Sequence, residues 1–299
     1  MTKVEKVVIS GSTSFIGQHL IEKLNELDYK IYAIIRKNSS KKNILLKFNN
    51  VNIIELDMEE IDQLPKLINE KCDTFYHFAW NGTRGTDRND KEKQEQNVIL
   101  SMRVLESAAK IGCKTFFTSG SQAEYGAQEK KVNENVQCNP NTAYGKAKLE
   151  FYKKAKSYCE KNSIRLIEPR FFSIYGPGDF SQTLVMSSLK KMKNNEDVEL
   201  SSCKQLWNFL YIKDAVNALV LLNENKAASG IFNMASNDTK PLKEFVLEMK
   251  DILNSQSQLL FSDQIPIGIN PDNTRLKETI NWHEKYSFEQ GIKEISCMI

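Results

Sequence analysis

The sequence has few residues of the kinds that bind metals, and those it has are scattered. It contains three histidines and six cysteines, and no two cysteines form a Cys-x-x-Cys pair or another metal-ligand spacing. We therefore expect no metal site. Cysteines without such a pattern are typical of reduced thiols, so we expect a cytoplasmic protein.

Long apolar runs and a large excess of charge are also missing. No apolar run approaches the roughly 20 residues that a membrane-spanning helix needs, and residues 1–6 lack a signal-peptide pattern. The net charge of +3 is too small to indicate a nucleic-acid or membrane partner. The 299 residues, 40% of them hydrophobic, are typical of a globular protein with two lobes.

The stretch with the most chemical information is residues 139–150. Residues 139–142 predict an entry turn and an N-cap, and residues 147–150 favour helix. Tyr144 and Lys148 are four residues apart, so their side chains share one face of the predicted helix.

That pairing matters because of its electrostatics. A free tyrosine has a pKa of about 10 and is a poor base near neutral pH, but a nearby ammonium lowers that pKa. The pair therefore predicts that Tyr144 exchanges a proton with a sugar hydroxyl or carbonyl. For the pair alone, the alternative is a helix with the tyrosine packed and the lysine solvated.

A glycine turn follows the first predicted strand. Residues 4–10 are rich in β-branched side chains, and residues 18–27 have helical periodicity. Gly11 permits a tight turn between them, and Gly17 permits close packing of the helix, whose N-terminus presents N–H groups to a pyrophosphate. Ser14 stands where a middle glycine is usual. The motif predicts a dinucleotide site, and a plain strand-to-helix turn is the alternative.

The second predicted strand, residues 31–35, ends without a carboxylate. An NAD site usually has an acidic residue there that accepts from the ribose hydroxyls. This sequence has Arg36 and Lys37 instead. Because an arginine can hold a 2′-phosphate with two hydrogen bonds, the strand end predicts NADP rather than NAD, unless it is a solvated basic loop.

Further strands are predicted at residues 51–56, 74–79 and 114–118. Their alternation with helices indicates a doubly wound parallel sheet, whose ligands bind at the carboxyl ends of the strands. Asp57 and Met58 are expected near the adenine, residues 80–93 over the cofactor, and Asn97 on a long helix. His77 has apolar strand neighbours, so we expect a structural role for it.

The fifth strand is followed by Ser119-Gly120-Ser121-Gln122. A hydroxyl at this point can donate to a substrate oxygen while Tyr144 exchanges its proton, and we expect Ser121 to supply it.

With these motifs in order, the chain resembles the extended short-chain dehydrogenase/reductases, in particular the NAD-dependent epimerase/dehydratase family that acts on nucleotide sugars. The resemblance covers essentially the whole chain. Its motifs are Gly11 to Gly17, Asp57, His-Phe-Ala at 77–79, Asn97, Ser119 to Gly126, Tyr144 with Lys148, and the segments 169–178, 208–215, 271–272 and 281–282. It implies an α/β fold: a Rossmann-type doubly wound parallel sheet with a smaller C-terminal α/β substrate lobe.

The resemblance also implies the site. Ser121, Tyr144 and Lys148 would form the catalytic triad, with Ser121 preferred to Ser119 because it lies four residues before Tyr125, as the family's serine or threonine does. The expected cofactor-binding residues are Gly11, Thr13, Ser14, Phe15, Ile16, Gly17, Arg36, Asp57, Met58, Phe78, Ala79, Asn97, Ser119, Tyr144, Lys148, Phe171 and Ser173. The expected substrate-binding residues are Trp80, Ser121, Gln122, Ser173 and Trp207.

We expect a dinucleotide-binding domain over residues 1–170, to which residues 205–235 return, and a substrate-binding lobe of residues 171–204 and 236–299. Two features depart from the family. Ser173 replaces the usual asparagine. The arginines that hold the substrate diphosphate in many relatives are absent: Trp207 takes the place of one, and residues 265–270 contain none. The diphosphate still needs positive charge, for which the sequence offers Lys190, Lys191, Lys193 and Lys204, unless these are merely solvated.

The family's 4,6-dehydratases have Asp-Glu directly after the catalytic hydroxyl residue. This chain has Gln122-Ala123 there, which excludes that activity. The leading hypothesis is an NADPH-dependent reductase of a nucleotide-linked 4-keto-6-deoxy sugar. A C4 epimerase with tightly bound NAD is the alternative, and a non-catalytic cofactor-binding regulator is the third. By analogy with the family we expect a homodimer through a helix pair that includes the Tyr144 helix.

Overall fold

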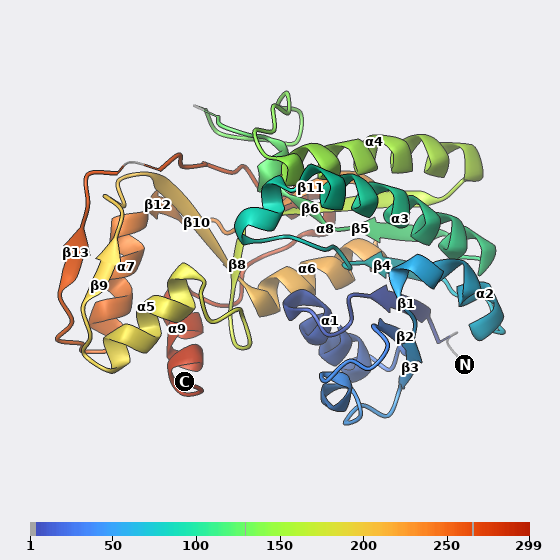
Figure 1. Ribbon diagram of the computed structural model, residues 1–299, viewed down its shortest axis with the longest axis horizontal. Coiled ribbons are helices and arrows are strands. Elements are labelled where there is room, and N and C mark those ends of the chain that lie inside the picture. Colours follow the sequence, from blue (N-terminus) through green and yellow to red (C-terminus); the bar gives the residue numbers. More distant parts are fainter. Residues whose placement is uncertain (1–3, 129, 265) are drawn as a thin grey trace. The chain divides into compact units, whose positions relative to one another are not determined.

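The structure, a computed structural model, describes residues 4–128, 130–264 and 266–299 (Figure 1). The chain divides into two compact units. The first comprises Met1–Gly126, Gln137–Arg170 and Leu219–Phe232, and the second comprises Ala127–Val136, Phe171–Ala218 and Asn233–Ile299. No helix in the described ranges is both long and apolar enough to cross a membrane.

A parallel sheet forms the centre of the first unit. Its strands are β1 (Lys6–Ser10), β2 (Lys30–Ile35), β3 (Val51–Glu55), β4 (Thr74–His77), β5 (Thr115–Thr118), β7 (Arg165–Phe171) and β11 (Gly230–Met234), with β6 (Gly120–Ser121) paired to β7. The order is β11-β7-β5-β4-β1-β2-β3. The sheet reverses its winding between β1 and β4, and such a switch point opens a crevice at the carboxyl ends of the strands. The predicted Rossmann-type fold is therefore confirmed.

Helices cover both faces of this sheet. They are α1 (Phe15–Glu26), α2 (Leu64–Leu67), α3 (Lys91–Lys110) and α4 (Ala143–Asn162), with the short turns η1 (Lys42–Ile44), η2 (Met58–Gln63), η3 (Gly85–Asn89) and η4 (Gln122–Glu124). Helices α3 and α4 pack together on one face, and α1 lies on the other (Figure 1). Phe75, Phe116, Val104 and Phe151 belong to the core beneath α3 and α4. This packing holds the end of β5 and the start of α4 in place.

The second unit has two small sheets. One is β12 (Thr239–Pro241), β10 (Leu206–Tyr211) and β8 (Ser173–Tyr175), and the other is β13 (Leu259–Phe261) with β9 (Val198–Leu200). Its helices are α5 (Leu184–Lys193), α7 (Leu242–Ile252), α8 (Thr274–Ile280) and α9 (Phe288–Ser296), while α6 (Ile212–Glu224) is shared with the first unit. The sequence did not predict β13 or α8, because three and seven residues are too few to show a periodicity.

Candidate active site

The glycine turn after β1 has the close contacts that only glycine allows. Gly11 has φ +72°, and a Cβ there would lie 2.7 Å from the carbonyl carbon of Phe78. A Cβ on Gly17 would lie 2.3 Å from the Gly11 oxygen. Ser14 caps α1, its hydroxyl accepting from the Gly17 N–H at 3.1 Å. The serine at the usual middle-glycine position therefore stabilises the start of the helix.

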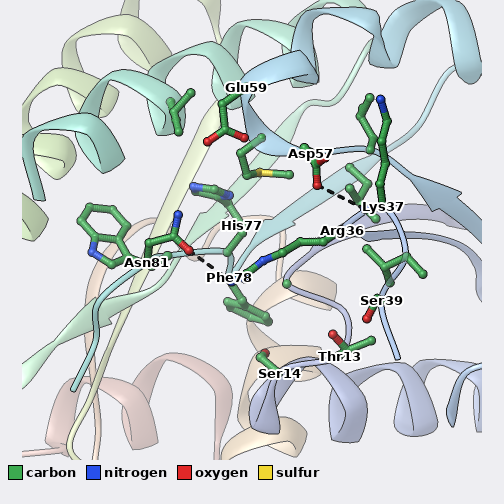
Figure 2. Close-up of a pocket in the computed structure, with 18 of the residues that line it drawn as sticks. Thr13, Ser14, Arg36, Lys37, Ser39, Asp57, Glu59, His77, Phe78 and Asn81 are labelled. Atoms are coloured by element: carbon green, nitrogen blue, oxygen red, sulfur yellow. Dashed lines mark hydrogen bonds between the residues drawn. The ribbon is translucent and has the colours of Figure 1, made fainter. Parts of the chain in front are cut away.

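A cavity of about 710 Å³ opens beside this turn, between the ends of β1, β2 and β4 (Figure 2). This volume is within the usual range of ligand pockets, about 300–1,000 Å³. The expected cofactor and substrate residues that line it are Gly11, Thr13, Ser14, Arg36, Asp57, Met58, Phe78, Ala79, Trp80 and Asn97. Phe15, Ile16 and Gly17 lie in the first turn of α1, adjacent to Ser14.

One end of the cavity is basic. Arg36 extends along it, and its Nη2 donates to Asn81 Oδ1 at 3.1 Å (Figure 2). Lys37 is paired with Glu60 at 2.5 Å. Within the described residues, Arg36 and the pocket-lining Lys41 make no ion pair with a carboxylate. Both side chains line the cavity. Asp57 instead supports the loop, since its Oδ1 accepts from the Lys37 N–H at 3.2 Å.

Ser121, Tyr144 and Lys148 come together in the first unit, at the end of β5 and the start of α4. Thr142 caps α4 as predicted, accepting from the Gly145 N–H at 3.0 Å. Tyr144 is buried and hydrogen-bonds with the Ser121 side chain. Burial raises the pKa of Tyr144 and the charge of Glu124 adds to this, whereas the Ser121 hydrogen bond and Arg88 lower it.

Lys148 is also buried, and its Nζ donates to Ser119 Oγ at 2.9 Å. Burial lowers the pKa of Lys148 to about 7, although the carboxylates of Glu124 and Glu168 oppose the effect. Its ammonium lies 5.7 Å from the centre of the Tyr144 ring. Lys148 is thus near its titration point at neutral pH while it faces the tyrosine.

A capping box fixes the backbone of Ser121. The Ser121 N–H donates to Glu124 Oε1 at 2.7 Å, and the Ala123 N–H donates to Ser121 Oγ at 3.2 Å. Glu124 has no exposed surface, and its other oxygen lies 2.9 Å from Arg170 Nη2. Arg170 Nε also donates to Glu168 at 2.9 Å. The Arg170 guanidinium therefore contacts two buried carboxyl groups. Burial raises the pKa of both carboxyls, Glu124 and Glu168.

Trp80 lies against Tyr144 and Lys148. Its ring centre is 3.6 Å from Lys148 Nζ and 6.3 Å from the centre of the Tyr144 ring, edge to face. The indole N–H donates to Gln94 Oε1 at 2.8 Å. Gln94 and Asn97, both buried on α3, also bind backbone carbonyls of the loop that follows β4. The residue expected to touch substrate is thus held over the lysine.

His77 has the structural role that we expected. It is buried between Ser10 Oγ at 2.7 Å and Ser101 Oγ at 2.9 Å. Burial lowers the pKa of His77 to about 3, with a smaller contribution from Lys148. The ring is therefore neutral near pH 7 and bridges β1, β4 and α3.

None of the contacts described above involves the remaining predicted residues. Gln122 follows Ser121 in η4, while Phe171, Ser173 and Trp207 belong to the second unit. Ile265, in the segment without the usual arginine, lies outside the described residues. In the described chain, no three His, Cys, Asp or Glu residues are grouped so that they could hold a metal.

Sequence reasoning missed three residues of this site. The spacing of Ser121 and Glu124 is a capping-box signature that could have identified Glu124. Gln94 lies three residues before the predicted Asn97 on the same helix, which is a weaker signal. Nothing in the sequence marks Arg88, whose position depends on the path of the loop.

Known proteins match this chain over nearly its whole length. A family model described as the NAD dependent epimerase/dehydratase family matches residues 7–235. A CDP-abequose synthase of Salmonella muenchen is 26% identical over 98% of this chain and 98% of its own. A UDP-N-acetyl-alpha-D-glucosaminuronate decarboxylase of Bacillus cytotoxicus is 26% identical over 97% of this chain and 96% of its own.

Solved structures have the same fold. The UDP-N-acetylglucosamine 4-epimerase from Methanobrevibacter ruminantium, in complex with UDP-N-acetylmuramic acid, has a TM-score of 0.89 at 22% identity and covers 99% of this chain and 98% of its own. The UDP-glucuronic acid 4-epimerase from Bacillus cereus, in complex with UDP-glucuronic acid and NAD, has a TM-score of 0.84 at 19% identity, with 98% of both chains covered. The family match spans well over half of the residues, so this chain belongs to the NAD-dependent epimerase/dehydratase family.

Proposed function

We propose that the protein is an NADPH-dependent reductase of a nucleotide-linked 4-keto-6-deoxy sugar. The observation that carries the proposal is the buried Tyr144 phenol, which hydrogen-bonds with Ser121 and lies on one helix face with Lys148. Because burial raises the pKa of Tyr144, the residue is a phenol at neutral pH and has a proton to give. A proton donor beside a carbonyl suits reduction better than oxidation.

Each member of the triad then has a chemical task. Ser121 donates a hydrogen bond to the keto oxygen and holds it beside the phenol. Tyr144 gives its proton to that oxygen, and Lys148 stabilises the phenolate that remains. The bound nicotinamide cofactor supplies the hydride for the carbonyl carbon. The Ser121–Glu124 capping box keeps the hydroxyl in place during the reaction.

We propose that the cavity holds a dinucleotide with a 2′-phosphate. Gly11 lets the turn pack directly on the backbone of Phe78, so the N-terminus of α1 lies beside the cavity, where its N–H groups suit a pyrophosphate. At the opposite end, β2 finishes at Ile35 without a carboxylate, and Arg36 and Lys41 lack carboxylate partners in the described chain. We therefore propose NADP rather than NAD as the cofactor, with Thr13, Ser14 and Asn97 among its contacts.

The substrate class is supported by the relatives. Two carry the names CDP-abequose synthase and UDP-N-acetyl-alpha-D-glucosaminuronate decarboxylase, and solved neighbours hold UDP-linked sugars. We extend nucleotide-sugar binding to this chain as a proposal. Trp80 and Gln122 of the first unit, and Ser173 and Trp207 of the second, stay proposed substrate contacts. The four lysines at 190, 191, 193 and 204 stay the proposed source of charge for the diphosphate.

A C4 epimerase is the second candidate, because solved neighbours are 4-epimerases and some of them contain NAD. An epimerase must retain its cofactor through both half-reactions, whereas a reductase consumes NADPH. The test is to denature the purified protein and identify any nucleotide that it releases. Retained NAD would replace the reductase with the epimerase. An empty site that prefers NADPH to NADH, and oxidation of NADPH by a 4-keto sugar nucleotide, would support the reductase.

Binding of NADPH without turnover of any such sugar would favour a non-catalytic regulator.

We also propose a homodimer. Helices α3 and α4 form a pair on one face of the sheet, and Ile99 on α3 is 55% exposed. The same helix pair of a second subunit, packed on this face, would cover the Ile99 side chain. Light scattering measures the mass directly, and an Ile99→Glu variant should shift it toward the monomer. The cytoplasmic location stays a prediction from the sequence.

A further inference from the structure

A second cation lies on the proposed proton donor. The guanidinium carbon of Arg88 is 4.6 Å from the centre of the Tyr144 ring. Arg88 belongs to η3, in the loop after β4, and Tyr144 to the first turn of α4. Both are in the first unit. A guanidinium at this distance from an aromatic face is in cation–π contact.

The surroundings leave the charge of Arg88 without a competing anion. Its Nη1 donates to the Thr83 carbonyl at 3.3 Å. The neighbouring carboxylates, Asp87 and Asp90, are instead paired with Lys93 at 2.7 and 3.5 Å. Among the residues that the structure describes, no carboxylate forms an ion pair with Arg88. Its positive charge therefore acts on the tyrosine ring.

Four groups determine how readily Tyr144 ionises. Arg88 faces it from η3, Lys148 from the next turn of α4, Glu124 from η4, and the Ser121 hydroxyl binds it. Arg88 and Ser121 favour the phenolate, and Glu124 opposes it. Lys148 favours the phenolate only while it carries a proton, and Lys148 itself faces Glu124 and Glu168. Arginine keeps its charge at any working pH.

We propose that Arg88 is a positioning residue that acts through Tyr144: its guanidinium stabilises the phenolate as the proton leaves. The phenolate spreads its negative charge into the ring, so a cation on the ring face attracts the phenolate more than the phenol. Only such a differential interaction accelerates a step. Arg88 maintains it above neutral pH, where Lys148 begins to lose its proton. This inference rests on the proposed function.

The proton balance is simple. The O–H bond of Tyr144 breaks, its proton joins the keto oxygen of the sugar as the carbonyl carbon receives hydride from the reduced nicotinamide, and the phenolate remains. Water returns a proton to Tyr144 after product release. Arg88 forms and breaks no covalent bond in this sequence.

The test has a readout that needs no substrate. The ultraviolet absorbance of phenolate is titrated in the full-length protein and in Arg88→Gln, each measured against the same protein with Tyr144→Phe, so that the difference reports Tyr144 alone. We expect Arg88→Gln to raise the pKa of Tyr144 by roughly half to one pH unit, the size of a cation–π contact whose cation is partly exposed. Arg88→Lys should restore most of the shift. Arg84→Gln removes an equal charge from the same loop and should leave Tyr144 unchanged.

Activity separates the remaining outcomes. With substrate, Arg88→Gln should lower kcat about three- to tenfold and leave KM nearly constant, and Arg88→Lys should recover most of the rate. A raised KM with an unmoved phenol titration would overturn the inference, because Arg88 would then bind a substrate anion. An equal shift in Arg84→Gln would also overturn it. A shifted titration in a protein that reduces no keto sugar would overturn the proposed function and leave the Arg88–Tyr144 interaction standing.

Discussion

The ammonium of Lys148 lies 3.6 Å from the centre of the Trp80 indole, closer than to the ring of the tyrosine it faces. The indole is held by a hydrogen bond to Gln94, so the contact is built into the loop after β4. A cation–π contact at a desolvated site contributes about 0.5–2 kcal/mol. Trp80 therefore opposes the effect of burial, which has lowered the pKa of Lys148 to about 7.

Replacement of Trp80 by leucine should make the alkaline limb of the activity profile fall at lower pH. Leucine keeps the site apolar but has no ring face, so the ammonium of Lys148 loses stabilisation and its pKa falls further, by up to about one pH unit. Trp80→Phe keeps a ring and should give a smaller displacement. The pH dependence of kcat measures both. If leucine and phenylalanine gave the same profile, the ring face would have no part in the effect.

Tyr144→Phe should lower turnover by about 10²–10⁴-fold, the usual contribution of a positioned proton donor. The ring and its contacts with Arg88 and Trp80 remain, so the fold and cofactor affinity should be unchanged. Steady-state kinetics and fluorescence titration with NADPH measure the two quantities. Near-normal turnover would remove Tyr144 from the mechanism.

Arg36→Ala should reduce the preference for NADPH over NADH. Charge-assisted hydrogen bonds to a phosphate contribute about 1.5–3 kcal/mol, so the ratio of the two affinities should fall by roughly ten- to a hundredfold. The affinity for NADH should change little, because NADH has no 2′-phosphate. The matched control is Lys42→Ala, because Lys42 is occupied by Glu55 at 2.6 Å. Should the control lose the same preference, general charge and not Arg36 would select the cofactor.

His77 should make the protein less stable in acid. Its pKa is about 3 in the folded state and about 6.5 when unfolded, so between these values the unfolded chain binds more protons. The stabilisation from neutral His77 is complete above about pH 6.5 and is lost as the pH falls toward 3. Between these pH values the free energy of unfolding falls by up to about 1.4 kcal/mol for each pH unit of acidification.

Urea unfolding at a series of pH values measures that slope. The variant His77→Gln has no such proton and should show a flatter profile over the same window, whatever its absolute stability. Parallel profiles for the two proteins would show that other groups, not His77, cause the acid sensitivity.

Much of the fold could be predicted because its signals are local. The Gly11 turn, the strand that ends at Ile35 and the helix start at Thr142 each depend on residues a few positions apart. The Rossmann-type sheet followed from the alternation of strand and helix signals, and the family from the resemblance of a longer set of motifs. The short elements β13 and α8 could not be predicted, because tertiary contacts rather than periodicity stabilise them.

The sequence by itself determined that Tyr144 and Lys148 share a helix face, because the helical repeat places residues four apart on one side. Only the tertiary structure decided what surrounds them. Trp80 over Lys148, Arg88 over Tyr144 and Arg170 between Glu124 and Glu168 join segments that are distant in the chain. Those contacts depend on where β4, β5, α4 and β7 come together, and through burial and charge they determine the protonation of the site.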